Sequence, residues 1–170
     1  MAYQYLGAMF VIIGCGGFGF SIAAASRREI HLLHQIISMT EFMEQELNYR
    51  LTPLPELCRR SGKYTGGSIR SVLYSLAQEL ERQVLPDANS CMRMVLHRME
   101  DLPRSVRRSL TELGATLGKY DLPGQLQGLE AVKTRCNWYL QRLEQNHHHR
   151  VRSYQTLGLC TGIALAILFI

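Results

Sequence analysis

Both ends of this chain lack charged side chains, and this pattern constrains the fold more than any other feature of the sequence. All 19 lysines and arginines and all 14 aspartates and glutamates lie between Arg27 and Arg152. An ordinary soluble globule with solvated ends is therefore excluded. A collagen-like or disordered chain is excluded as well, because 46% of the residues are hydrophobic while glycine and proline number only 14 and 5.

The first charge-free segment predicts a transmembrane helix. Residues 5–26 are more than twenty residues long, and a helix that rises about 1.5 Å per residue can cross a hydrocarbon core of about 30 Å over that length. A cleaved signal peptide is the main alternative, but it needs a basic region before its apolar core, and no lysine or arginine precedes Arg27. We expect residues 1–26 to form an uncleaved N-terminal transmembrane helix.

A second charge-free segment covers residues 154–170, and its seventeen residues reach the lower limit for a membrane-crossing helix. Two arginines directly follow the first segment, and Arg150 and Arg152 precede the second. Positively charged residues flank membrane spans on the cytoplasmic side. We therefore expect a multi-pass protein of the cell membrane, with residues 27–153 in the cytoplasm and both termini outside.

The middle segment, residues 27–153, has helical periodicity and no clear strand-like alternation. Proline and glycine interrupt its apolar pattern at Pro53, Gly62, Gly66–Gly67, Pro86, Pro103 and a loop from Gly118 to Gly124. The first and last helices are expected to continue into the two charge-free segments. The sequence thus predicts an all-α fold, a cytoplasmic helical bundle of about six helices between an N-terminal and a C-terminal transmembrane helix.

No motif in the sequence points to catalysis or to a cofactor. Gly14, Gly16 and Gly19 fit a GxGxxG pattern, but inside an apolar helix such glycines favour close helix packing over dinucleotide binding. The side chains of His147–His149 would diverge on a helix, and the five cysteines lack zinc-site spacing. The net charge of +5 is a mild excess without the basic face of a nucleic-acid domain. We expect no enzyme activity, no cofactor, no metal and no nucleic-acid partner.

Two surfaces are candidates for contact with a partner. Arg104, Arg107 and Arg108 share one helix face, opposite a stripe of leucines. A solvated face explains them simply, and a docking patch for an acidic partner or anionic lipid is the functional alternative. The second candidate is a tightly built turn after a helix-ending glycine, and it consists of Lys119, Tyr120 and Asp121.

Three features of the chain occur together in one known family. They are the glycine-rich N-terminal segment, the turn Asn48-Tyr49-Arg50-Leu51-Thr52-Pro53-Leu54-Pro55-Glu56, and Leu117-Gly118-Lys119-Tyr120-Asp121 before a long helix into the apolar end. With them the whole chain resembles the stage III sporulation protein AB family, a membrane component of spore-forming bacteria. That family is similar to the inner-membrane platform proteins of type II secretion and type IV pilus systems.

The resemblance implies a non-enzymatic platform subunit of the channel-like complex between mother cell and forespore, located in the mother-cell membrane and needed for endospore development. It also implies partners: a cytoplasmic hexameric ATPase of the secretion type, stage III sporulation protein AA, and other stage III sporulation membrane proteins, besides the membrane lipids. The alternative function is that of a membrane-tethered helical adaptor or signalling module that binds another cytoplasmic protein.

Overall fold

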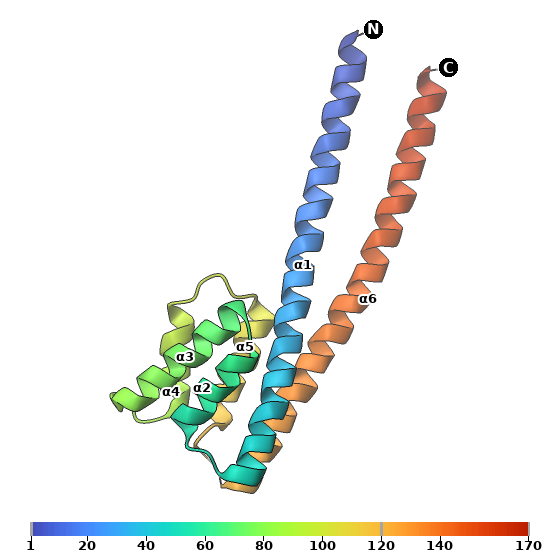
Figure 1. Cartoon of the computed structure of the whole chain (residues 1–170). Coiled ribbons are helices and arrows are strands. Elements are labelled where there is room, and N and C mark those ends of the chain that lie inside the picture. The colour runs from blue at the N-terminus through green and yellow to red at the C-terminus, as the bar shows by residue number, and fades with distance from the viewer. Residues whose placement is uncertain (1, 120, 170) are drawn as a thin grey trace.

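The computed structural model describes the backbone of residues 2–119 and 121–169 and the side chains of residues 24–119 and 121–145. Within that backbone it shows six helices and no strand (Figure 1), so the predicted all-α fold is confirmed. Among the residues with described side chains, no helix is long and apolar enough to cross a membrane. The two predicted transmembrane segments, residues 1–26 and 154–170, fall outside these residues apart from positions 24–26.

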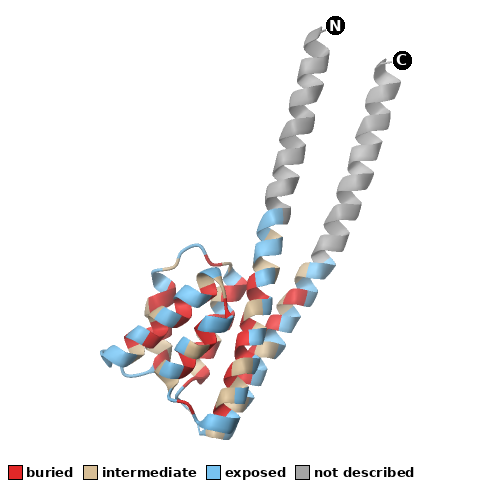
Figure 2. Ribbon diagram, viewed as in Figure 1, coloured by how far each residue is buried: buried red, intermediate tan, exposed pale blue. Residues whose placement is uncertain are grey.

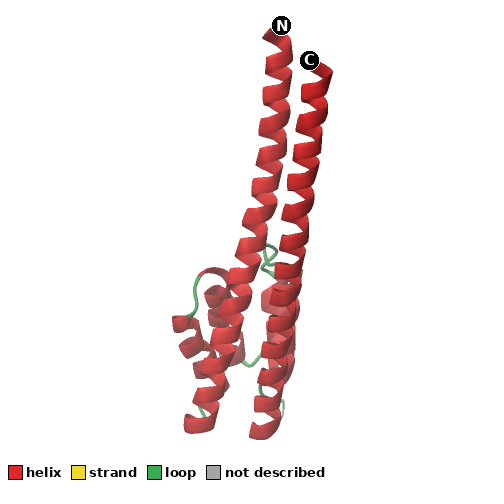
Figure 3. Cartoon of the chain, turned by 90° about the vertical axis from the view of Figure 1, so that its right-hand side faces the viewer, coloured by secondary structure: helices red, strands yellow, loops and turns green. Residues whose placement is uncertain are grey.

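Two long helices and four short ones make up the fold. Helices α1 (Ala2–Arg50) and α6 (Leu122–Phe169) pack against each other, and the short helices lie together on one side of them (Figures 1 and 3). The short helices each pack on the next along the chain, and they are α2 (Leu54–Tyr64), α3 (Gly67–Arg82), α4 (Ala88–His97) and α5 (Arg104–Thr116).

The chain reverses at each short loop, so the loops gather at two ends of the bundle (Figure 1). We call one the distal end, formed by the turns at residues 51–53 and 83–87 and by residues 117–119 and 121. We call the other the proximal end, formed by the loops at residues 65–66 and 98–103. The proximal end lies beside Glu29 of α1, which accepts a hydrogen bond from the Ser105 hydroxyl of α5.

The helix boundaries follow the local chemistry of the chain, with two differences from the predicted breaks. Helix α2 continues through Gly62 to Tyr64. Helix α6 begins at Leu122 instead of after Gly124, because proline is tolerated in the first turn of a helix, where backbone N–H groups have no helical partner. Gly118, at a φ of +73°, reverses the chain after α5 as predicted.

One hydrophobic core joins all six helices, and Figure 2 shows the buried residues on the sides of the helices that face one another. Close approach of α5 and α6 depends on Gly128, because a Cβ atom at that position would lie 2.1 Å from Cγ2 of Thr116. The largest fully buried side chains come from the first five helices and from the residue that follows α5, and they are Leu33, Ile36, Met39, Met43, Leu57, Ile69, Leu73, Leu76, Met92, Leu110, Leu113 and Leu117.

A half-buried ion pair fixes α6 against α1. Nζ of Lys133 lies 2.9 Å from Oε2 of Glu44 on α1 and 2.6 Å from Oε2 of Glu130 on its own helix. The hydrogen bonds to Glu130 and Glu44 raise the pKa of Lys133 above its usual range. The Lys133–Glu44 pair therefore joins the two long helices beside their shared core.

Candidate partner-binding surface

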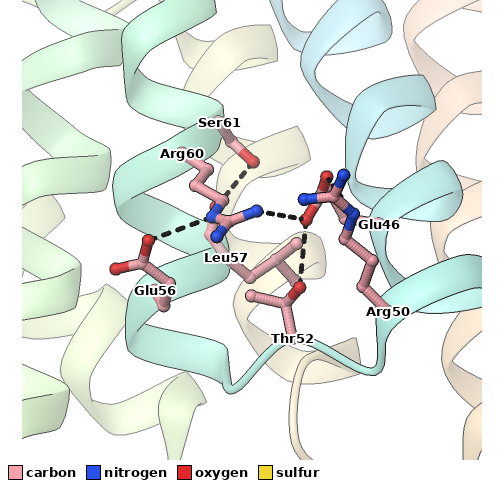
Figure 4. Close-up of polar contacts among 7 residues, drawn as sticks. All are labelled: Glu46, Arg50, Thr52, Glu56, Leu57, Arg60 and Ser61. Carbon is pink, nitrogen blue, oxygen red and sulfur yellow. Dashed lines mark hydrogen bonds and ion pairs between the residues drawn. The ribbon is translucent and has the colours of Figure 1, made fainter.

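The turn between α1 and α2 is organised around one carboxylate (Figure 4). Oε2 of Glu46 accepts a hydrogen bond from the Thr52 hydroxyl at 3.0 Å and one from the Arg60 guanidinium at 3.1 Å. Arg60 also donates to Glu56 at 3.0 Å, and this hydrogen bond raises the pKa of Arg60. Because Glu46 lies before the turn and Arg60 after it, these contacts tie the end of α1 to the side of α2.

This turn presents two large exposed side chains at the end of α1. Tyr49 is 86% exposed and Leu51 is 69% exposed. Leu51 also has a φ of +47°, in the left-handed region that non-glycine residues rarely adopt. The core does not account for an apolar side chain that is held in solvent on a strained backbone position. A left-handed residue commonly ends a helix, and here it directly follows α1, so the turn combines an ordinary helix ending with an apolar side chain at the surface.

The turn between α5 and α6 lies at the same distal end. Oδ1 of Asp121 accepts a hydrogen bond from the Gly124 N–H at 3.3 Å, and the Asp121 carbonyl accepts one from the Gln125 N–H at 2.9 Å. Asp121 thus caps the start of α6, which gives this candidate residue a structural role. Lys119 is exposed on the same turn, while Tyr120 lies outside the described residues.

Two hollows open between the turns of the distal end. The smaller, of about 270 Å³, lies between the first and last turns and is lined by residues that include Leu51, Thr52, Gly118 and Gln125. The larger hollow has a volume of about 680 Å³ and extends to the turn between α3 and α4. Leu54 and Gly118 line both hollows. The other residues that line the larger one include Leu80, Leu85, Asp87, Asn89, Leu117 and Lys119. The distal end is therefore concave and mostly apolar, with polar groups at its rim.

The three arginines of the other candidate surface do not act as one group. Arg104 and Arg108 are exposed, whereas Arg107 is turned toward α4. Nη1 of Arg107 donates to the carbonyl of Leu96 and Nη2 to that of Met99, each at 2.6 Å. The prediction of a single solvated face is wrong for Arg107, because its guanidinium satisfies carbonyls at the end of α4.

The two candidate surfaces also lie at opposite ends of α5. This helix has 13 residues, which separates the arginines at its start from the turn after its end by roughly 20 Å. Arg104 neighbours Ser105, which contacts Glu29 at the proximal end. Lys119 and Asp121 belong to the distal end, so the structure does not bring the two surfaces together.

The side chains with reactive chemistry are isolated or buried. In the ranges 24–119 and 121–145, no three His, Cys, Asp or Glu side chains gather closely enough to hold a metal ion. Burial raises the pKa of Cys58 to about 12, and it also raises the pKa of Cys91 and of Cys136. Thiols with raised pKa values are poor nucleophiles, so these three cysteines act as apolar core groups.

Residues of the candidate surface that sequence reasoning missed are Tyr49 and Leu51. Both residues belong to the turn at residues 48–56, which carries the family resemblance. Helical periodicity, however, gives no indication of a side chain that is exposed at a positive φ. An apolar residue directly before a Thr-Pro pair, where the helix must end, was the available signal.

Comparison with known protein families shows to which family the chain belongs. The profile of stage III sporulation protein AB matches residues 4–170, which is nearly the whole chain. The chain belongs to the stage III sporulation protein AB family. The stage III sporulation protein AB of Bacillus subtilis (strain 168) is 21% identical over 168 residues, which cover 97% of this chain and 98% of that protein.

A solved structure agrees with the fold of this family member. The structure of a stage III sporulation protein AB matches with a TM-score of 0.63 and 19% sequence identity, over 72% of this chain and 98% of that one. At this level of identity the likeness concerns the fold alone. The resemblance of the sequence to this family is confirmed.

Proposed function

We propose that this chain is a non-enzymatic membrane platform subunit of the secretion-system-like complex between mother cell and forespore. Its bundle faces the mother-cell cytoplasm and contacts a hexameric secretion-type ATPase, stage III sporulation protein AA, alongside other stage III sporulation membrane proteins. Membership of the sporulation family supports this proposal, as do the charge-free segments of the sequence at both ends.

The observation that carries the proposal is the concave distal end of the bundle. Helix α1 extends from Arg27, next to the charge-free N-terminal segment, to Arg50 at the distal end, a length of about 35 Å. If the charge-free segments span the membrane, the distal end is the surface farthest from the bilayer. A soluble ATPase reaches that surface most easily, and it carries Tyr49, Leu51 and both hollows.

In this proposal the predicted contact residues belong to two partners. Lys119 and Asp121 lie at the distal end and join the proposed ATPase surface. Arg104 and Arg108 lie at the proximal end, on the side of Arg27, where they would face anionic lipid headgroups. Arg107 is excluded from both surfaces by its contacts with α4.

Co-purification tests the ATPase surface. Changing Tyr49→Asp and Leu51→Asp together places two charges on the exposed turn, and we expect recovery of the ATPase from sporulating membranes to fall about tenfold or more. The far-UV circular dichroism melt should stay unchanged, because both side chains are exposed. The matched control is Arg104→Glu with Arg108→Glu, which should retain ATPase recovery.

The outcome separates the proposed function from its alternative. Equal ATPase recovery from the distal variant and the wild type would remove the distal end from the proposal. Recovery of a different cytoplasmic protein without any ATPase would instead support the adaptor function.

Topology is tested by labelling of introduced cysteines, because burial alone would silence Cys58, Cys91 and Cys136 on either side of a membrane. In a chain with Cys15→Ser and Cys160→Ser, we expect Arg93→Cys to react with an impermeant maleimide only after the cells are opened. Arg93 is exposed, so the folded bundle leaves its position open to the reagent. Labelling of this position in intact cells would contradict the cytoplasmic orientation.

A further inference from the structure

The side of α6 that faces away from the bundle carries an uncharged stripe with coiled-coil spacing. The stripe consists of six exposed residues, which follow one another at steps of 4, 3, 4, 3 and 4. They are Gln127, Ala131, Thr134, Trp138, Gln141 and Gln145. Trp138, the single tryptophan of the chain, is 51% exposed in the middle of this stripe. In Figure 3 helix α6 runs along the front of the molecule, and no other helix covers it.

The rest of α6 is arranged as this spacing requires. If the stripe occupies the a and d positions of a heptad repeat, then Leu129, Cys136 and Leu143 occupy the f positions on the opposite side of the helix. Leu129 and Cys136 are fully buried in the bundle, and Leu143 packs against the same core. Helix α6 therefore packs one side on the bundle and leaves the side that carries the stripe exposed.

The charges beside the stripe specify a partner. Glu130 and Glu144 fall at g positions, and Arg135 and Arg142 at e positions. In a parallel pair of identical helices, a g residue meets the e residue five positions later in the other helix, so Glu130 meets Arg135 of the second copy. In an antiparallel pair, g faces g and e faces e, which brings carboxylate to carboxylate and guanidinium to guanidinium.

Both charged side chains remain accessible to a second copy. Glu130 pairs with Lys133 and is 63% exposed, and Arg135 pairs with Glu112 at 2.6 Å and is 52% exposed. Exposed ion pairs of this kind contribute little to folding, so either group can accept an additional partner at small cost.

We propose that two copies of this chain associate in parallel along the uncharged stripe of α6. The parallel direction rests on the proposed function, since two chains in one membrane share one orientation. Four of the six stripe residues are Gln or Thr, so the association is weak between chains free in solution. Confinement to a membrane raises the effective concentration of the second copy and makes such a contact sufficient.

Disulfide trapping in nanodiscs or native membranes tests the stripe. In the full chain with Cys15→Ser and Cys160→Ser, we introduce Thr134→Cys or Gln141→Cys, because identical positions face each other only in a parallel pair. Under mild oxidation we expect the covalent dimer to form at least fivefold more than from Glu41→Cys, an exposed position on α1. Equal dimer yields at all three positions would overturn the proposal.

A charge exchange tests the direction and the partner together. In the Thr134→Cys chain, Glu130→Arg and Arg135→Glu should each reduce the dimer yield several-fold, because like charges then face each other. The double variant with both changes should recover most of the yield. Circular dichroism melts identify any loss of folding that follows from the contact of Arg135 with Glu112. If the double variant folds and stays as low as the single ones, the proposed pairing is wrong.

Resistance to extraction by alkaline carbonate is measured on the same samples. A chain that resists extraction but forms no dimer along the stripe contradicts this inference and leaves the membrane function standing. A chain that carbonate extracts contradicts the membrane function, and with it the reason for a parallel pair.

Discussion

One arginine at the start of α5 binds two backbone carbonyls, one near the end of α4 and one in the loop that follows it. Nη1 and Nη2 of Arg107 reach the carbonyls of Leu96 and Met99, both at 2.6 Å. A planar guanidinium with its donors in a fixed fork suits two carbonyls that lie side by side. This single side chain therefore joins the start of α5 to the end of α4.

Replacement of Arg107 should destabilise the bundle. Charge-assisted hydrogen bonds contribute about 1.5–3 kcal/mol, so Arg107→Ala is expected to lower the free energy of unfolding by that order. Lysine cannot supply the same fork, so Arg107→Lys should recover only part of the loss. Urea unfolding followed by circular dichroism measures both, with the exposed Arg108→Ala as control, expected within about 0.5 kcal/mol of wild type. Equal stability of the Arg107→Ala and Arg108→Ala chains would contradict this role.

At the scale of the elements, the turn between α1 and α2 is a preformed structure. Thr52 and Arg60 both donate to one oxygen of Glu46, and Arg50 lies 4.0 Å from the other. These contacts restrain the residues on both sides of Leu51, which has a left-handed backbone and an exposed side chain. The shape of the distal end thus depends on a carboxylate that itself stays inside the turn.

Removal of this carboxylate should weaken both the turn and the partner contact. We expect Glu46→Ala to lower the free energy of unfolding by about 1–3 kcal/mol, because it leaves the Thr52 hydroxyl without its acceptor and Arg60 with Glu56 alone. ATPase recovery should fall as well, since Leu51 is no longer held in place. The exposed Glu41→Ala, on the same helix, should change neither quantity. Loss of stability with full ATPase recovery would mean that the turn serves the fold alone.

The helices could be predicted from the sequence because their signals are local. Pro53, Pro86 and Pro103 interrupt the apolar periodicity, and each lies in a loop of the structure next to a helix start. The sequence predicts the start of α6 too late, because Pro123 indicates a loop while Asp121 in fact caps the helix. The function of Arg107 could not be predicted, since its acceptors lie 8 and 11 residues away and depend on how α4 packs.

At the scale of the whole molecule, one core connects both long helices to the four short ones. Leu33 of α1, Leu73 of α3 and Leu113 of α5 are fully buried in the same cluster. A bundle that shares one core is expected to unfold in a single cooperative transition. The distal and proximal ends are then two faces of one folding unit, so a partner bound at one end stabilises the whole bundle.

A destabilising substitution in one helix, observed through a distant fluorophore, tests this cooperativity. The substitution is Leu73→Ala on α3, and the fluorophore is Trp138 on α6. Loss of a buried leucine costs about 2–5 kcal/mol, so we expect the urea midpoint to fall by the same amount for Trp138 fluorescence and for circular dichroism. The full chain in detergent is measured at two protein concentrations, which separates unfolding from any association through α6. A Trp138 transition that stays at the wild-type midpoint while the helical signal shifts would show that α2–α5 unfold apart from α1 and α6.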